Sequence, residues 1–249
     1  DAMYDVLGEE KPNQKVQIKI QAERLDQYFP SNYTDRQKVE LIEKLVKSWH
    51  DQRIQKKQLK KYYDKAKLKN IITNTTRGYK EIVKNSPNIG GNKNIFLNSY
   101  LMGAYLVSLY KNTKDIISLN EFDEILVTGL NNFEFMKKQM SKVDLLSIQY
   151  KEKIEKAGRW CETNKDKYPT NWLVSVEDKE NVNLTHIVFT RCGLCALCKR
   201  ENVPELTPSL CATDYITMSF ANCRLERPIT LGNGDKCCNF YITKKNHAV

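Results

Sequence analysis

The chain has 249 residues, of which 41% are hydrophobic and 28% are charged. This composition is typical of a folded globular protein and excludes a disordered chain. No apolar stretch approaches the ~20 residues that a transmembrane helix needs. The first thirty residues carry charges and lack the apolar core of a secretion signal. We therefore expect a cytoplasmic protein without a membrane partner.

The positive charge is concentrated in one block. The net charge is +10, and residues 35–84 hold 15 Lys or Arg but only 6 Asp or Glu. Tyrosines interleave the block at Tyr62, Tyr63 and Tyr79, a combination that nucleic-acid-binding surfaces also show. No known nucleic-acid-binding motif accompanies it, however, and basic residues of this kind commonly form a solvated helix face. We therefore expect no nucleic-acid partner.

Residues 1–168 are predicted to be mostly helical. Helical spacing of apolar residues continues almost throughout this region, although the alternation at Val16–Ile20 fits either a short edge strand or an early helix. Helices are expected from Thr34 or Asp35 to Trp49, through residues 59–66, and on to about Val83.

A Pro-, Gly- and Asn-rich loop at residues 86–94 precedes three further predicted helices. The first, from about Ile95 to Tyr110, is apolar on every side and should be buried. The second begins after Ser118, where Glu121 completes a capping box. The third runs from Lys142 to about Thr163.

From Trp172 the pattern changes to the alternation of strands. The expected order is strand, strand, helix, helix, strand, strand, with these elements at residues 172–176, 184–189, 192–202, 208–221, 224–229 and 237–242. This order predicts an antiparallel sheet of about four strands with two helices on one face. The fold class is therefore α+β, with a helical region at 1–168 packed on a cysteine-rich α+β region at 169–249.

Seven of the eight cysteines lie between Cys192 and Cys238. Without a secretion signal, this density argues against a disulfide framework. Cys211 and Asp214 are three residues apart on one predicted helix and are therefore neighbours. Cys237 and Cys238 open the last strand, where adjacent side chains point to opposite faces, so one of them faces the helices.

Each cysteine taken singly fits a buried apolar position, but the cluster as a whole suggests a chemical site. We interpret Cys161 and Cys223, which stand apart, as structural. The Cys-x2-Cys-x2-Cys run from Cys192 to Cys198 could hold zinc or an iron–sulfur cluster. Because the run lies in a predicted helix and not in a glycine-rich loop, we expect no metal and no cofactor.

Several of these segments resemble the L-2-amino-thiazoline-4-carboxylic acid hydrolase-like family. The resemblance covers about residues 89–242 and is most specific from Arg191 onward. Its motifs are an Arg-Cys-x-x-Cys segment, a Cys-x-x-Asp helix, a Leu-x-Arg-x-x-Thr-Leu strand with a glycine turn, a closing Cys-x-Phe, and an upstream Gly-Gly loop. Here these are Arg191–Cys195, Cys211–Asp214, Leu225–Leu231 with Gly234, Cys238–Phe240, and Gly90–Gly91 with Asn94.

The resemblance implies a bacterial hydrolase that opens a small cyclic amidine or isothiourea ring, as when L-2-amino-thiazoline-4-carboxylate becomes N-carbamoyl-L-cysteine. It implies catalytic roles for Cys192, Cys211, Asp214 and Cys238. Three positions depart from the family: Asn239 replaces an Asp, and Cys198 and Cys237 stand where the family usually lacks Cys. Asn239 can act neither as an acid nor as a base.

The chemistry of such a ring opening suggests roles for the candidate residues. A thiolate attacks the amidine carbon or holds the attacking water, and Asp214 protonates the ring nitrogen or accepts a proton. The sequence does not choose between Cys192 and Cys211 as the nucleophile.

The substrate carboxylate is expected on the amides of Gly90 and Gly91, near Asn94 and a helix N-terminus, or on Arg227. Two alternatives stay open: a small-molecule-binding or sensor module with a thiol-lined pocket, and a metal or iron–sulfur protein.

Overall fold

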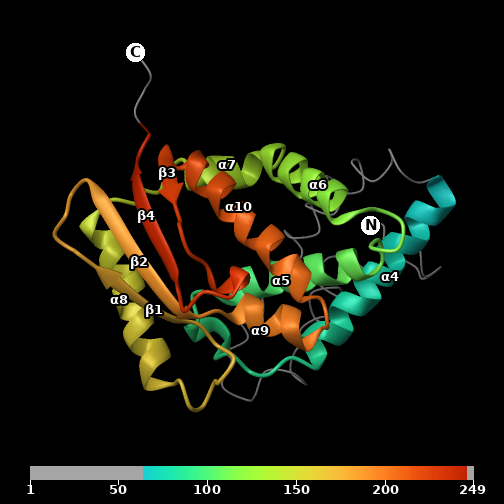
Figure 1. Cartoon of the computed structure of the whole chain (residues 1–249), viewed down its shortest axis with the longest axis horizontal. Coiled ribbons are helices and arrows are strands. Elements are labelled where there is room, and N and C mark those ends of the chain that lie inside the picture. Colours follow the sequence, from blue (N-terminus) through green and yellow to red (C-terminus); the bar gives the residue numbers. More distant parts are fainter. Residues whose placement is uncertain (1–63, 246–249) are drawn as a thin grey trace, which may run out of the picture.

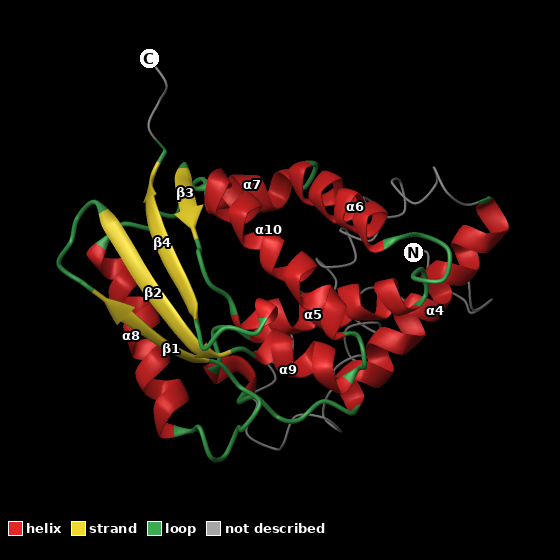
Figure 2. Cartoon of the chain, viewed as in Figure 1, coloured by secondary structure: helices red, strands yellow, loops and turns green. Residues whose placement is uncertain are grey.

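A computed structural model describes residues 64–245 of the chain (Figure 1). The elements predicted at residues 16–20 and 34–49, and most of the helix through 59–66, lie outside this part. The described part consists of helices beside one four-stranded antiparallel sheet (Figure 2). The predicted α+β class, with a helical part followed by a C-terminal sheet, is confirmed.

Two long helices form the base of the helical part. Helix α4 spans Lys65–Lys84, and its first turn is capped by Asp64, whose carboxylate accepts a hydrogen bond from the backbone N–H of Lys67. Helix α5 spans Leu97–Lys111 and is buried on almost every side, as its apolar sequence predicted. The two helices lie against each other, and the rings of Tyr79 and Tyr105 meet edge to face at 6.0 Å.

The next helices are α6 (Leu119–Asn131), α7 (Glu134–Met140) and α8 (Ile148–Thr163). The capping box of Ser118 and Glu121 is present, as predicted. The expected start of a helix at Lys142 was wrong, because Ser147 caps α8 and accepts from the N–H of Tyr150. Helix α7 has no buried residue, so it lacks the apolar period that would have predicted it.

The sheet has the order β1-β2-β4-β3, and all neighbouring strands are antiparallel. Its strands are β1 (Leu173–Glu177), β2 (Leu184–Arg191), β3 (Cys223–Glu226) and β4 (Cys238–Lys244). Strand β3 ends earlier than the predicted residue 229, and Pro228, which has no N–H to give to a ladder, follows it.

Helices α9 (Gly193–Arg200) and α10 (Thr207–Phe220) lie between β2 and β3 in the chain, as predicted. Three short 3₁₀ helices complete the fold: η1 (Gly91–Lys93), η2 (Pro204–Leu206) and η3 (Leu231–Asn233). The apolar face of the sheet carries Cys238, Phe240 and Ile242 of β4 and packs against side chains of both α8 and α10, including Ile154 and Met218.

The larger core combines residues from both sides of the boundary at 168 and 169. Leu197 of α9 and Leu210 of α10 belong to the same buried cluster as Leu106 of α5 and Phe122 of α6. Helix α10 also contacts α6, α7 and strand β3 (Figure 1). Helix α10 therefore lies between the helical part and the sheet, and α9 packs on α5 and α10. Within residues 64–245, no helix has both the length and the hydropathy to cross a membrane.

Candidate thiol site

The site begins at the turn from β2 into α9. Cys192 is the N-cap of α9 and has an extended backbone, with φ −127° and ψ 123°. Gly193 follows, packed so tightly on Trp172 that a Cβ there would lie 2.4 Å from Cζ3 of the indole. The indole is in turn stacked on Phe96, with ring centroids 5.1 Å apart. This packing fixes the position from which the Cys192 thiol enters the site.

Cys192 and Cys195 form a polarised pair of thiols. The Cys195 thiol donates a hydrogen bond to the Cys192 sulfur, and this bond lowers the pKa of Cys192 against the opposing effect of burial. The backbone N–H groups of Cys195 and Leu194, at the start of α9, lower it further. The same hydrogen bond, together with burial, raises the pKa of Cys195. Cys192 is thus the more acidic thiol of the pair.

Helix α10 and the segment after β3 supply an ion pair. Asp214 lies one turn from Cys211 on α10, and its Oδ2 accepts a hydrogen bond from Nη1 of Arg227 at 2.7 Å. Nη2 of Arg227 donates to the carbonyl oxygen of Cys211 at 2.9 Å. Burial raises the pKa of Asp214 to about 6, although Arg227 opposes the shift. Burial also raises the pKa of Cys211, to about 12.

Arg227 is held from several sides. Its side chain is only 3% exposed, and its guanidinium lies 5.0 Å from the ring centre of Tyr215 and 4.9 Å from that of Phe240. Such contacts between a cation and aromatic faces are favourable. Nε of Arg227 has no hydrogen-bond partner in the structure. The guanidinium is therefore fixed in place and directed at Asp214.

The fourth thiol lies under the short turn η3. Cys238 is buried at the start of β4, whereas its neighbour Cys237 is half-buried. The Cys238 sulfur accepts a hydrogen bond from the N–H of Leu231 at 3.2 Å. A Cβ on Gly232 would lie 3.4 Å from the Cys211 sulfur. The turn Leu231–Asn233 therefore packs against both thiols.

These groups lie within electrostatic reach of one another. A thiolate at Cys192 raises the pKa of Cys195, Cys211 and Cys238, and the Asp214 carboxylate acts to raise the pKa of Cys192, Cys211 and Cys238. The structure thus brings together the four predicted residues Cys192, Cys211, Asp214 and Cys238. It adds two neighbours, Cys195 and Arg227, of which Arg227 was expected only to bind substrate.

The comparison with protein families agrees with this cluster. The family model described as L-2-amino-thiazoline-4-carboxylic acid hydrolase matches residues 99–242, which is more than half of the chain and includes all six residues of the cluster. The chain belongs to this family. No curated protein and no solved structure gives a significant match.

The Gly-Gly loop lies outside the segment that matches the family. Gly90 has a φ of 98°, and a Cβ there would meet the ring of Trp160 at 2.1 Å. Its N–H donates to Oδ1 of Asn88 at 2.7 Å. Asn94 is 3% exposed, and its side-chain NH₂ donates to Ile89 O and to Oδ1 of Asn171. The loop is thus tied to the end of α8 and to residues around it.

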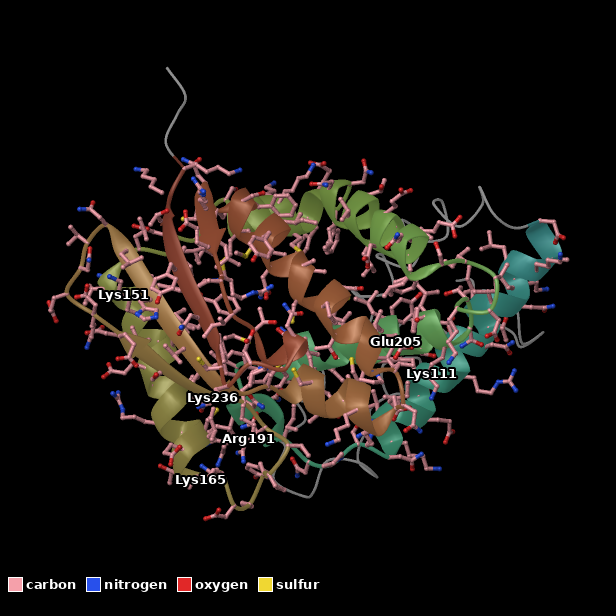
Figure 3. All side chains as sticks on the ribbon, viewed as in Figure 1. Lys111, Lys151, Lys165, Arg191, Glu205 and Lys236 are labelled. Carbon is pink, nitrogen blue, oxygen red and sulfur yellow. The ribbon has the colours of Figure 1, made fainter. Side chains whose placement is uncertain are left out.

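Arg191 also turns toward that end of α8. Its Nε donates to Asn171 O at 2.8 Å, and its Nη2 donates to Lys165 O and Tyr168 O. Figure 3 shows Arg191 and Lys165 at the same edge of the molecule. The thiolate of Cys192 is consequently favoured by Cys195 and the backbone of α9, and not by a guanidinium of Arg191 turned toward it.

A cavity of about 280 Å³ meets the thiol cluster at Asp214, although no cysteine lines it. Its walls come from α5, α6, α7, α9 and α10 and from the α6–α7 connection. They are mostly apolar and include Met102, Leu106, Leu130, Phe133 and Leu194. Asp214 lies in the wall as well, with 38% of its side chain exposed. Asp214 is therefore shared by the cavity and the thiol cluster.

Two features of the site were not predicted from the sequence. Cys195 was placed in the cysteine run without a role of its own, although a Cys-x-x-Cys spacing at a helix start was the available signal. The turn at residues 231–233 was expected only as a glycine turn. Within residues 64–245, no three His, Cys, Asp or Glu side chains are arranged to hold a metal ion.

Proposed function

We propose that the protein is a hydrolase that opens a small cyclic amidine or isothiourea, with Cys192 as nucleophile and Asp214 as the acid–base residue. The model reaction is the conversion of L-2-amino-thiazoline-4-carboxylate into N-carbamoyl-L-cysteine. One observation carries the choice of nucleophile: the pKa of Cys192 is lowered, whereas burial raises that of Cys211 to about 12. Of the two thiols, Cys192 is therefore the more acidic and the one we assign as the attacking nucleophile.

In the first step the Cys192 thiolate adds to the ring carbon that lies between sulfur and nitrogen. The ring carbon–sulfur bond then breaks, the ring sulfur leaves as a thiol after taking a proton, and the substrate carbon stays bound to Cys192 as an S-linked isothiourea. The Cys195 thiol positions Cys192 through its hydrogen bond. This step uses the ordinary strategy of covalent catalysis, which divides one difficult step into two easier ones.

In the second step a water molecule attacks the same carbon. The Asp214 carboxylate accepts the water's proton and returns it as the Cys192 sulfur departs, so that the product carries a ureido group and the enzyme is regenerated. A group with a pKa near 6 is suited to exchanging protons close to neutral pH. Arg227 holds the carboxylate in place through the 2.7 Å bond.

The remaining predicted residues have supporting roles in this proposal. Cys211 and Cys238 stay protonated, because burial raises the pKa of both, and they form the wall of the site beside the 231–233 turn. Gly90, Gly91 and Asn94 shape the loop that abuts α8. The substrate is a small molecule, and we propose that the reaction proceeds in the cytoplasm without a cofactor and without nucleic acid.

The experiment is a turnover assay with L-2-amino-thiazoline-4-carboxylate, in which the thiol released from the ring is followed by a chromogenic thiol reagent. Cys192→Ser should abolish turnover, whereas the control Cys237→Ser, at a half-buried thiol with no role in the mechanism, should leave it unchanged. Equal activity of Cys192→Ser and the wild type would refute the proposed nucleophile. Saturable binding without turnover in the wild type would favour a sensor module.

A further inference from the structure

The start of α9 places two thiols close together. Cys192 occupies the N-cap and Cys195 the first turn, and residues three apart in this arrangement have Cβ atoms about 5–6 Å apart. The two side chains already share a hydrogen bond. A disulfide needs a Cβ separation of about 3.5–4.5 Å, so a small approach of one side chain toward the other is sufficient to form it.

The two thiols are also accessible and unequal. Both are half-buried, whereas Cys161, Cys198, Cys223 and Cys238 are buried. Cys192 receives hydrogen bonds from the helix N-terminus and from Cys195, as the attacking thiolate of a Cys-x-x-Cys motif does. Cys195 is the protonated partner of the pair, the state of a resolving thiol before it reacts.

We propose that Cys192 and Cys195 form a redox-active dithiol that closes to an intramolecular disulfide by exchange with a low-molecular-weight disulfide. The Cys192 thiolate attacks one sulfur of that disulfide, which releases one thiolate and leaves a mixed disulfide on Cys192. Cys195 then loses its proton and attacks the Cys192 sulfur, which releases the second thiolate. Counted from the Cys192 thiolate and the Cys195 thiol, the protein loses two electrons and one proton, and the small disulfide is reduced to one thiol and one thiolate.

The closed disulfide removes the proposed nucleophile, so oxidation switches off hydrolysis if the chain is a hydrolase. The disulfide itself does not depend on that function. Its formation can be measured by mass, without any turnover assay, and the two proposals can therefore fail separately.

The test uses oxidised glutathione and mass spectrometry of tryptic peptides under non-reducing conditions. Trypsin cuts after Arg191 and Lys199, which releases residues 192–199 with the thiols of Cys192, Cys195 and Cys198. After incubation of the folded protein, this peptide should be lighter by two hydrogen atoms. Reduced glutathione should restore its mass.

Two variants identify the partners. In Cys195→Ser, the peptide should instead gain one glutathione on Cys192, because the mixed disulfide has no resolving thiol. In Cys198→Ala, which removes a fully buried thiol, the disulfide should still form. The proposal is overturned if the wild-type peptide keeps its mass across glutathione ratios, or if the disulfide persists in Cys195→Ser. Circular dichroism shows whether each variant is folded.

The cavity supports a second inference, which is independent of the dithiol but rests on the proposed function. Its lining contains no Lys, Arg or His, and the charge of Asp214 is neutralised by Arg227. None of the residues first expected to bind a substrate carboxylate, namely Gly90, Gly91, Asn94 and Arg227, lines this cavity. A substrate carboxylate bound in this cavity would therefore have neither a cation nor a loop N–H group to pair with.

We infer that the substrate carries an apolar substituent at the ring position where L-2-amino-thiazoline-4-carboxylate carries its carboxylate. The cavity binds this substituent. Its volume of about 280 Å³ is close to twice that of a cavity of about 150 Å³ that binds one benzene. A substituent as large as a phenyl group or a branched alkyl chain therefore fits between α5 and α6 with the reacting ring at Asp214.

The test compares 2-amino-4-phenyl-thiazoline with L-2-amino-thiazoline-4-carboxylate. The phenyl compound should have at least a tenfold higher kcat/KM. Leu130→Arg places a cation in the cavity wall and should reverse this order, whereas Val127→Arg, on the exposed side of the same helix, should not. A higher kcat/KM for the carboxylate in the wild type overturns the inference. If the wild type bound the phenyl compound without hydrolysing it, and Leu130→Arg no longer bound it, the cavity would still be the binding site. The proposed hydrolase activity would then be refuted.

Discussion

Nη1 of Arg227 lies 2.7 Å from Oδ2 of Asp214, and the same guanidinium binds the carbonyl oxygen of Cys211 through Nη2. A single side chain thereby joins the segment after β3 to two successive turns of α10. Because Arg227 is 3% exposed and lies between Tyr215 and Phe240, its position is fixed by packing as well as by charge.

Removing this guanidinium should destabilise the fold. Breaking a buried ion pair typically costs about 3–5 kcal/mol, but Asp214 is 38% exposed and can be hydrated or protonated, so we expect about 2 kcal/mol for Arg227→Met. Arg227→Lys should recover only part of this loss, because an ammonium cannot make both bonds while stacked between two rings. Urea unfolding measures both values. A Lys variant as stable as the wild type would show that the paired geometry contributes nothing.

Asp214→Asn should lower kcat/KM for ring opening by about 10²-fold or more, the usual contribution of a positioned acid–base group. Burial raises the pKa of Asp214 to about 6, so the ionised carboxylate that accepts the water's proton is lost as pH falls through 6. The wild-type rate should therefore rise with pH near 6, and the variant should lack that part of the profile. If the rate of the variant fell in the same way at low pH, the fall would belong to a group other than Asp214.

Cys195→Ala should make Cys192 a weaker acid. The Cys195 hydrogen bond is the largest influence that lowers the pKa of Cys192, so its removal moves that pKa upward. The rate of alkylation of Cys192 by iodoacetamide, followed on the tryptic peptide as a function of pH, gives the midpoint directly. Cys198→Ala serves as the control and should leave the midpoint in place. An unchanged midpoint in Cys195→Ala would contradict the paired arrangement.

Gly193→Ala should destabilise the turn that presents Cys192. The new methyl group would meet Cζ3 of Trp172 at 2.4 Å, and overpacking of this kind costs about 1–3 kcal/mol. The cost should be smaller in a Trp172→Phe background, since the smaller ring leaves space. Thermal unfolding of the four proteins in this double-mutant cycle measures the coupling between the two residues. Additive effects would show that the two positions do not interact.

Much of the fold could be predicted from short-range patterns. The alternation of Cys238, Phe240 and Ile242 gave β4 its buried face, and Ser118 with Glu121 marked the start of α6. Helix α7 could not be predicted in this way, because it has no buried residue. The extra turn predicted for α8 failed because Ser147 and Asp144 bind backbone N–H groups and end the preceding turn.

The site was only partly predictable, because its decisive contacts join distant segments. Cys211 and Asp214 were placed together by helix spacing alone. Nothing local indicates that Arg227 binds Asp214, thirteen residues away, or that Leu231 donates to the sulfur of Cys238. The acidity of Cys192 depends likewise on its position at the N-cap of α9, whereas the sequence predicted Cys192 as the first residue of the helix itself.

The most direct test of the proposed hydrolase is to trap the intermediate. The protein is mixed with excess L-2-amino-thiazoline-4-carboxylate or its phenyl analogue, quenched in acid within the first turnover, digested with trypsin and analysed by mass spectrometry. The account predicts that residues 192–199 carry the mass of the intact substrate, attached at Cys192, and that the adduct is absent from Cys192→Ser. An adduct on Cys211 would contradict this prediction. So would turnover without an adduct on any cysteine, provided that an added S-linked isothiourea standard survives the same quench and digestion.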